Sequence, residues 1–357
     1  MNMPGIRRVL EAAIRAPSGD NAQPWRFVVH EGPETILEIW LDPDADTSFY
    51  NRDNHAAYFA LGACVENICT AASSEGIHTQ VAVFPTAHEK MLVARVVCTT
   101  CPVSEHPRAR AIVGRVTNRH PYEIDALPES VLTALTEAGR SDETQVHIMT
   151  KREDAKILGH IAATNEYVML GDERLHRFFF EHINWTQEED AKKQTGFFVA
   201  SLALPPPALL GFKIARSWKR CSLLNTYLHF NKIVADQNAA LYEQAAAFCC
   251  VTTSEESPRA AFAAGRAFEA CWLEAQKQGL QVQPLMGTLF LRFASPAAGE
   301  EGLSPEAFER VKEGVSQLQS IFGYVGRKPY ALFRVGKAKK EAVYTQRLSV
   351  DAVTTWK

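Results

Sequence analysis

The chain has 357 residues, enough for two domains of ordinary size or for one large domain. Its 38 lysines and arginines stand against 41 aspartates and glutamates, and a formal net charge of −3 does not favour a nucleic-acid-binding protein. Hydrophobic residues make up 46% of the chain, which predicts a sizeable buried core.

The N-terminal segment contains no apolar stretch of the kind that a secretory signal needs. The longest apolar stretch, residues 196–212, is interrupted by three prolines at 205–207 and is too short to cross a bilayer. Eight cysteines are scattered along the chain, as is typical of reduced, buried thiols. We therefore expect a cytoplasmic protein without a membrane partner.

Residues 9–29 predict a helix, a polar loop and a strand, in that order. The loop, APSGDNAQPWR at 16–26, is rich in the residues that make turns. Asn21 and Gln23 carry side-chain amides, which donate and accept hydrogen bonds and are suited to reading a flat heterocycle. As structure alone, Asn21 would be a turn former and Trp25 a core residue, and the residues themselves leave both interpretations open.

Residues 60–77 predict a long helix with a glycine stop at Gly76, followed by strands at 78–84 and 91–98. The CxxC at residues 98–101 has no second CxxC or histidine pair at zinc spacing. We interpret Cys98 as a buried residue at a strand end and predict no metal site. Periodicity is then lost over residues 101–125, which predicts a boundary near residue 108.

The segment RVTNRHPY at 115–122 follows this boundary. Alternation places Arg115, Thr117 and Arg119 on one side of an extended chain, and arginine forks suit phosphate. The alternative is a solvated, charged linker.

The second part of the chain repeats the order of the first. Residues 131–149 again predict helix, loop and strand, with Val131 matching Val9. Residues 263–280 align without a gap with residues 60–77, so that Gly265 falls on Gly62 and Glu269 on Glu66. The sequence thus predicts an α+β protein of two related halves, 1–108 and 109–357. The second half carries an insertion at about 160–245, in which residues 178–180 and Trp185 are interpreted as helix core, with a role in lining a pocket as the alternative.

Two further segments are candidates for ligand contact. In QPLMG at 283–287, Gly287 has no side chain, so backbone N–H groups can approach a ligand closely. In YTQRLSV at 344–350, Arg347 is by default an exposed residue of the tail. The sequence contains no P-loop, GxGxxG, HExxH or GxSxG motif.

Together these segments resemble the nitroreductase family of FMN-dependent oxidoreductases. Residues 16–29 resemble the family's loop that grips the flavin ring, which implies contacts from Pro17, Ser18, Gly19, Asn21 and Gln23. RVTNR is similar to the family's RRSxR segment, which implies that Arg115 binds the phosphate, Thr117 the ribityl chain and Arg119 the pyrimidine edge.

The last two segments extend the resemblance. GLQVQPLMG resembles the strand end that places a backbone amide beside flavin N5, through Pro284, Met286 and Gly287. TQRL resembles the C-terminal basic pair, of which only Arg347 remains. The sequence departs from the family at Val116, Thr345 and Met286, where arginine, a second basic residue and often an acidic residue stand.

Members of the family are usually homodimers with each FMN at the interface, and this chain looks like both subunits fused, as in the tandem Acg-like branch. The resemblance implies a nitroreductase-like fold whose two halves form an intrachain pseudo-dimer, monomeric or weakly homo-oligomeric. It also implies one FMN per chain, because only the first half holds the ring loop and only the second holds RVTNR, PLMG and TQRL.

The resemblance further implies an oxidoreductase that uses NAD(P)H to reduce a small acceptor such as a nitroaromatic, a quinone or a flavin. No catalytic side chain is predicted, because the cofactor would carry the chemistry. Two other functions stay open: a protein that sequesters FMN under a lid with little turnover, and an interaction protein with a degenerate site.

Overall fold

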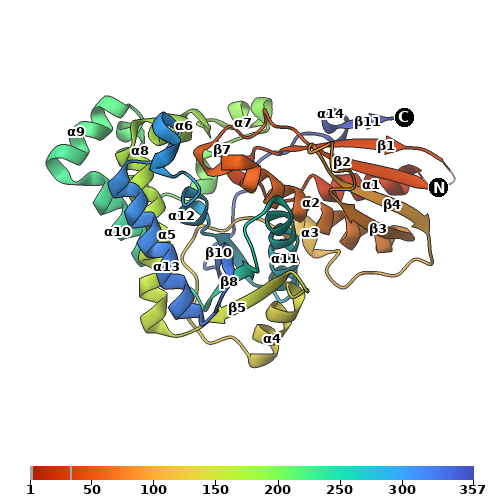
Figure 1. Cartoon of the computed structure of the whole chain (residues 1–357). Coiled ribbons are helices and arrows are strands. Elements are labelled where there is room, and N and C mark those ends of the chain that lie inside the picture. Colours follow the sequence, from red (N-terminus) through yellow and green to blue (C-terminus); the bar gives the residue numbers. More distant parts are fainter. Residues whose placement is uncertain (1–2, 33) are drawn as a thin grey trace.

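The structure is a computed structural model that describes residues 3–32 and 34–357. It contains two mainly antiparallel sheets that lie on either side of two long central helices, with a helical region beside the second sheet (Figure 1).

The first sheet consists of strands from the N-terminal part of the chain and one strand from the C-terminal tail. Its order is β11-β1-β2-β4-β3. Buried and partly exposed residues alternate along β1 and β2, so one face of these strands packs against the core and the other faces outward. The strands are β1 (Trp25–His30), β2 (Thr35–Leu41), β3 (Ile77–Val83), β4 (Leu92–Thr100) and β11 (Thr354–Trp356).

The second sheet has the order β5-β8-β10-β9, and its central strands β8 and β10 are buried along nearly their whole length. Such strands are covered on both faces. The strands are β5 (Thr144–Met149), β8 (Ala247–Thr253), β9 (Gln281–Pro284) and β10 (Lys328–Gly336).

The two sheets share one connectivity. The first half runs α1 (Met3–Ala13), β1, β2, α2 (His55–Ala72), β3, β4, and the second runs α4 (Glu129–Ala138), β5, β8, α11 (Pro258–Lys277), β9, β10. In each sheet the second strand pairs with the first and the fourth, and the third strand lies at the edge beside the fourth. All these pairings are antiparallel.

Helices α2 and α11 pack against each other at the centre, where nearly every residue of α2 is buried. A Cβ atom on Gly62 would lie 2.0 Å from the Phe262 carbonyl oxygen, and one on Gly265 would lie 1.9 Å from that of Phe59. The two helices therefore approach each other through two glycines, and the contact is reciprocal. The gapless alignment of residues 60–77 with 263–280 pairs these same positions.

The ends of α11 follow from its sequence. Ser257 precedes the helix, and its Oγ accepts a hydrogen bond from Ala260 N at 3.1 Å, while Pro258 occupies the first helical turn. After the helix, Gly279 has a φ of +73°, a conformation that glycine adopts without steric cost.

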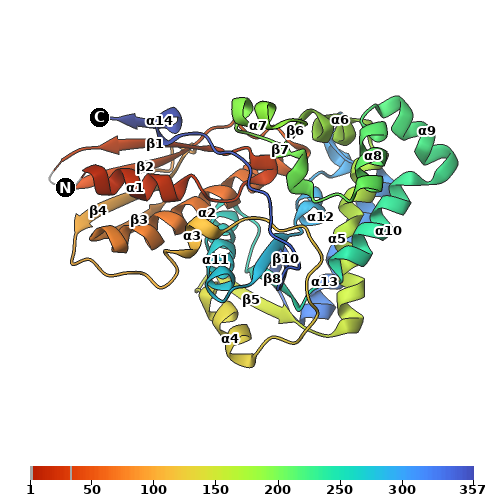
Figure 2. The same ribbon diagram turned by 180° about the vertical axis from the view of Figure 1, so that it is seen from behind.

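The C-terminal tail crosses from the second sheet to the first. After β10 it runs to α14 (Val350–Val353) and β11, which lies parallel to β1 with Phe27 opposite Thr354 (Figure 2). The tail passes the ring loop of residues 16–26 on this route, since Leu348 N donates to Gln23 Oε1.

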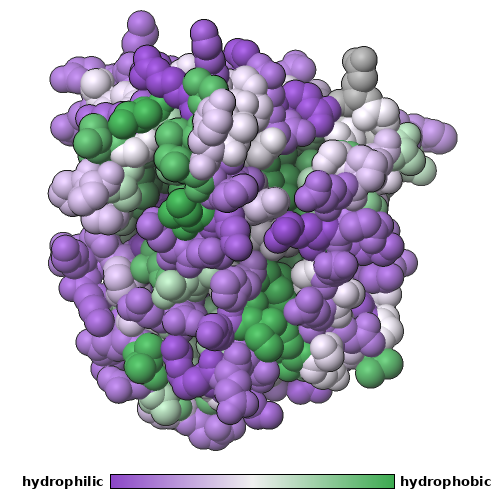
Figure 3. Space-filling view, turned by 90° about the vertical axis from the view of Figure 1, so that its left-hand side faces the viewer, coloured by the Kyte–Doolittle hydropathy of each residue, from purple (hydrophilic) through white to green (hydrophobic). Residues whose placement is uncertain are grey.

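The helical region contains most of the expected insertion. Helices α5 and α10 pack together, α13 lies against α5, and β6 and β7 form a short parallel pair. Figure 3 views the side of the molecule to which these helices belong, where apolar side chains are scattered among hydrophilic ones. The elements are α5 (Arg152–Gly171), α6 (Glu173–Glu181), β6 (Ile183–Asn184), α7 (Gln187–Lys193), β7 (Phe197–Phe198), α8 (Pro206–Ala215), α9 (Trp218–Leu228), α10 (Phe230–Tyr242), α12 (Gly287–Leu291) and α13 (Pro305–Phe322), and a short α3 (Ala111–Gly114) precedes α4.

All eight cysteines have free thiols, and burial raises the pKa of Cys98 to about 12. Among the described residues, no helix combines the length and the apolar character that a membrane span needs. The same residues contain no group of three or more histidine, cysteine, aspartate or glutamate side chains placed to hold a metal ion.

Candidate functional site

The ring loop is a tight turn between α1 and β1. Asp20, Asn21 and Gln23 have φ values of 47°, 56° and 56°, in the left-handed region that aspartate and asparagine tolerate better than most residues. Ser18 Oγ accepts a hydrogen bond from Gln23 N at 3.0 Å and closes the turn. The polar composition of the loop is thus explained in part by its backbone.

The two amides of the loop hold the tail and the insertion. Asn21 Nδ2 donates to Gln346 O at 3.0 Å, and Gln23 Nε2 donates to Gln194 O at 2.7 Å. Gln23 is fully buried and its Oε1 accepts from Leu348 N at 2.9 Å. Asn21 Oδ1 is buried and has no hydrogen-bond partner in the described part of the chain. The loop therefore brings the first half, the insertion and the tail together.

A basic cluster lies beside this junction. Its centre is Arg115, which is 6% exposed. Arg115 Nε lies 3.0 Å from Glu269 Oε1, and the guanidinium lies 4.3 Å from the centre of the Trp272 ring. Arg115 Nη2 donates a hydrogen bond to the carbonyl oxygen of Arg15, a residue of the short segment between α1 and the ring loop. Arg115 thus ties the second half of the chain to the first.

Arg347 completes the basic cluster from the tail. Burial and the nearby positive charges of Arg115 and Arg15 together lower its pKa to about 9, against the attraction of Glu269 and Asp190. Arg347 Nη1 donates to Thr345 Oγ1 at 2.9 Å, whereas its Nε is buried with no hydrogen-bond partner among residues 3–32 and 34–357. Arg15, Arg115 and Arg347 therefore lie close together, and the nearby carboxylates neutralise only part of their positive charge.

Glu269 supplies only part of that compensation. Burial raises the pKa of Glu269 to about 7, although the charge of Arg115 opposes the rise. A carboxyl group with this pKa is only partly ionised near neutral pH. An added anion would relieve the repulsion among Arg15, Arg115 and Arg347, so the basic cluster is suited to a phosphate or a carboxylate.

Thr117 lies next to the strand that leads to Gly287. It forms an isolated parallel bridge with Val282 of β9, and Asn118 N donates to Val282 O at 3.2 Å. The segment 115–119 therefore runs beside β9, whose last residue is Pro284, and Met286 directly precedes α12. Two of the predicted segments, far apart in the sequence, are neighbours in the structure.

Arg119 lies between the insertion and the ring loop. Its Nη1 donates to Ser201 O at 3.0 Å, and its guanidinium lies 5.3 Å from the centre of the Phe197 ring. Burial lowers the pKa of Arg119, and the negative charge of Asp20 partly opposes this. Burial, assisted by Asp46, raises the pKa of Asp20 to about 7, against the attraction of Arg119.

Gly287 is covered by helix α5. A Cβ atom at position 287 would lie 2.2 Å from Asn165 Oδ1, so a side chain here would displace Asn165. Tyr50 OH donates to this same oxygen at 2.9 Å. Residues of the insertion therefore lie against both Gly287, which follows β9, and Arg119.

The open space at the ring loop is small. A pocket of about 160 Å³ borders the loop and is lined in part by Asp20, Ala22 and Leu348. Typical ligand pockets measure about 300–1,000 Å³. In this conformation the insertion and the tail fill much of the region around the loop.

The sequence analysis missed four residues at this junction: Arg15, Asn165, Gln194 and Ser201. Gln194 and Ser201 act through backbone carbonyls, which any residue supplies, and Asn165 sits in an ordinary helix. Arg15 directly precedes the ring loop, and its charge beside that loop is a signal that the sequence did contain.

The interpretation of residues 178–180 and Trp185 as helix core is wrong for Trp185, which is not in a helix, whereas the alternative of pocket lining holds for Phe180 and Trp185. Residues 178–180 do belong to α6, and Phe180 is buried, but Phe180 and Trp185 also line a pocket of about 510 Å³. Trp185 lies outside any helix, between β6 and α7.

Comparison with known proteins gives relatives of one kind. No family model matches the chain. An uncharacterized protein of Mycobacterium tuberculosis is 26% identical over 79% of this chain and 39% of its own length. Two further M. tuberculosis proteins bear the names "Putative NAD(P)H nitroreductase" and "Putative NAD(P)H nitroreductase acg". They are 30% and 28% identical over 34% and 33% of this chain, and over 36% and 35% of their own lengths. Over about a third of its length, the chain is therefore similar in sequence to putative NAD(P)H nitroreductases.

These matches cover only part of each relative. The chain spans 39% and 57% of the lengths of the first two curated relatives. Among solved structures, the FMN-dependent nitroreductase NfnB from Mycobacterium smegmatis in complex with NADPH is 15% identical, with a TM-score of 0.36 over 69% of this chain and 91% of that one. This overall structural similarity is low, so the similarity to nitroreductases rests on the partial sequence matches.

Proposed function

We propose that the chain binds FMN at the junction of ring loop, basic cluster and tail, and acts as an NAD(P)H-dependent oxidoreductase on a small acceptor. The acceptor would be a nitroaromatic, a quinone or a flavin. The proposal rests on the partial sequence similarity to putative NAD(P)H nitroreductases and on one observation above all: the convergence of Arg15, Arg115 and Arg347 on a region where Glu269 and Asp190 compensate only part of the positive charge.

The basic cluster fits the phosphate end of FMN. Arg347 Nε is a buried donor without a partner, and the repulsion among the three arginines would fall when a dianion binds. Arg115 would act chiefly as a fixed positive charge, since Glu269 and Trp272 already hold its side chain. Arg347 is therefore the residue expected to bind phosphate directly.

The ring loop and the segment 115–119 would hold the rest of the cofactor. Asn21 Oδ1 is an acceptor without a partner, Thr117 lies beside β9, and Arg119 holds a positive charge opposite Asp20. When bound, the flavin would supply the redox chemistry. The chain would contribute charge from Arg119 and close backbone approach at Gly287.

We further propose that the halves 1–108 and 109–357 form a pseudo-dimer within the chain, which would be a monomer or a weak homo-oligomer. Their identical strand order and the reciprocal packing of Gly62 and Gly265 support this. A single flavin site would remain, because the second half carries the residues AGRSDETQV at 138–146, and not a second ring loop, where its helix leads into β5.

A second function, the sequestration of FMN with little turnover, is favoured by the covering of the site. Ser201 and Phe197 lie against Arg119, Asn165 lies against Gly287, and the pocket at the ring loop is small. A lid formed by residues 196–212 would slow the approach of a nicotinamide ring until it opens.

One experiment separates the two functions. Flavin-loaded protein is mixed anaerobically with NADH, NADPH or dithionite in a stopped-flow instrument, and the loss of flavin absorbance is followed. An oxidoreductase is reduced by at least one nicotinamide, and Phe197→Ala speeds this step while leaving dithionite reduction unchanged. Absence of reduction by both nicotinamides, in wild type and in the variant, would contradict the enzymatic proposal.

A further inference from the structure

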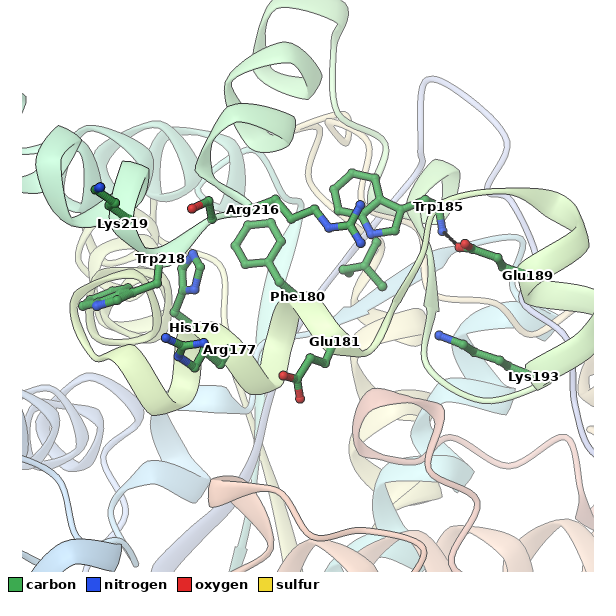
Figure 4. A pocket seen from close by; sticks show the side chains of 12 residues that line it. His176, Arg177, Phe180, Glu181, Trp185, Glu189, Lys193, Arg216, Trp218 and Lys219 are labelled. Atoms are coloured by element: carbon green, nitrogen blue, oxygen red, sulfur yellow. Dashed lines mark hydrogen bonds between the residues drawn. The ribbon is translucent and has the colours of Figure 1, made fainter.

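A pocket of about 510 Å³ lies in the helical region and shares no lining residue with the pocket at the ring loop (Figure 4). Its walls come from three segments: α6, the segment of β6 and α7, and the start of α9. Its volume lies within the range of about 300–1,000 Å³ that is typical of small-molecule sites. The lining residues include His176, Arg177, Phe180, Glu181, Trp185, Glu189, Lys193, Arg216, Trp218 and Lys219.

Aromatic rings form part of the pocket wall. Phe180 and Trp185 lie nearly parallel, with an angle of 9° between the rings and 6.4 Å between their centres. On the other side, Trp218 meets His176 edge-on at 5.2 Å. Flat aromatic walls of this kind bind planar rings well. The Arg216 guanidinium lies 4.9 Å from the centre of the Trp185 ring, which holds a cation at the same wall.

Positive charge predominates in the pocket. Four cations and two carboxylates line it, and only one of the four cations, Arg177, is in an ion pair, with Glu173 outside the pocket. Within the described residues, Lys193, Arg216 and Lys219 have no carboxylate within ion-pairing distance. Cations left unpaired around one cavity favour an anionic ligand.

His176 adds a polar group that has no partner. Its side chain is only 1% exposed, and its Nε2 lies 2.8 Å from Ala215 O. Because a carbonyl can only accept, Nε2 carries the proton, and burial lowers the pKa of His176 so that the ring is neutral. Nδ1 is then a buried acceptor with no hydrogen-bond partner in the described chain. A ligand that donates an O–H or N–H would satisfy it.

Trp185 presents the opposite requirement. Its Nε1 is a buried donor that likewise has no hydrogen-bond partner among the described residues. Two buried polar groups in the wall of one cavity, one acceptor and one donor, each cost free energy while unsatisfied. A ligand with an oxygen near Trp185 and a donor near His176 would remove both costs.

From these observations we propose that the pocket between α6, α7 and α9 binds a small planar aromatic anion, separately from the junction at the ring loop. Aromatic carboxylates and nucleoside monophosphates share this chemistry: a flat ring, a negative charge and an O–H or N–H donor. Arg216 would contact both the anion and the Trp185 ring, and Lys193 and Lys219 would add charge.

The test is calorimetric titration of the full chain with two probes, 4-hydroxybenzoate and adenosine 5′-monophosphate. Both titrations are repeated with excess FMN, which separates this pocket from the basic cluster. Inorganic phosphate tests the charge alone, and benzyl alcohol and adenosine test the ring alone. We expect at least one probe to bind saturably with or without FMN, and the probe that binds more tightly identifies the ligand class.

Substitutions of residues that line the pocket test the proposal most directly. Arg216→Ala and Trp218→Leu should each weaken the better probe at least about tenfold, by loss of a charge-assisted or aromatic contact. Arg220→Ala is the matched control, because Arg220 is an exposed arginine of α9 that does not line the pocket. The proposal is overturned if neither probe binds, if inorganic phosphate binds as tightly as the ring compounds, or if Arg220→Ala weakens binding as much as Arg216→Ala.

Discussion

Gly62 and Phe262 touch through the backbone: a Cβ atom added to Gly62 would lie 2.0 Å from the carbonyl oxygen of Phe262. Gly265 and Phe59 repeat this contact at 1.9 Å across the same helix pair. Two helices that meet in this way must move apart to accept any side chain at either position. The junction of the two halves therefore depends on both glycines.

Gly62→Ala and Gly265→Ala are each expected to lower the free energy of unfolding by at least about 2 kcal/mol, because the clash is with rigid backbone. Chemical denaturation followed by circular dichroism measures this. Gly211→Ala is the control: Gly211 lies in α8 with nothing within 4 Å of its would-be Cβ. There alanine should leave stability unchanged or raise it by up to about 1 kcal/mol. Equal effects at all three positions would contradict the close helix contact.

Asp20 should make stability depend on pH. Burial raises its pKa to about 7 from a usual value near 3.8, so the folded state keeps a proton that the unfolded state releases. Its contribution is complete below about pH 4 and is lost as pH rises through about 7. Asp20→Asn should therefore stabilise the flavin-free protein at pH 8 and have little effect at pH 4. Asp44→Asn, at an exposed position, should show no such trend in denaturation measured across this range.

We expect replacement of Arg115 to lower the free energy of unfolding even when no ligand is present. Arg115→Ala leaves Glu269 as a buried carboxylate without its partner, at a cost of about 3–5 kcal/mol. The loss should be smaller at pH 5 than at pH 8, because the pKa of Glu269 is about 7 and the group is then protonated. Arg259→Ala breaks an exposed pair with Glu143 and should cost less than about 1 kcal/mol. Urea denaturation at both pH values would show an equal loss if Glu269 were not involved.

Arg347→Ala should weaken FMN much more than riboflavin, which lacks the phosphate. Loss of a charge-assisted contact costs about 1.5–3 kcal/mol, or about one to two decades in affinity. Fluorescence titration with both ligands measures the difference. Lys339→Ala removes an exposed cation of the same tail and should leave both affinities within about twofold. A similar loss for FMN and riboflavin in Arg347→Ala would mean that Arg347 does not contact phosphate.

The sequence predicted those elements whose formation depends on residues close together along the chain. The periodicity of residues 60–77 and 263–280 predicted α2 and α11, and the structure shows that their aligned glycines lie at the contact between these helices. It was uninformative where the partner is a backbone atom from a distant segment. Gln194 O and Ser201 O contact Gln23 and Arg119, yet nothing in their side chains indicates this.

The insertion shows a second limit. Amphipathic periodicity predicts that a residue is buried, but it does not distinguish packing against the core from lining a cavity. Phe180 and Trp185 were therefore interpreted as core, whereas they also line the pocket beside Arg216. Asn165 is a comparable case, since its contact with Gly287 depends on how α5 lies across the strand end.

The central claim is that the chain holds one flavin, between the ring loop of its first half and the basic cluster and tail. The most direct measurement is the ratio of flavin to protein in the full chain after saturation with FMN and removal of the excess, by absorbance and amino-acid analysis. The account predicts one FMN per chain in wild type and a marked loss in Arg347→Ala. A ratio of two, or wild-type protein that retains no flavin, would contradict it.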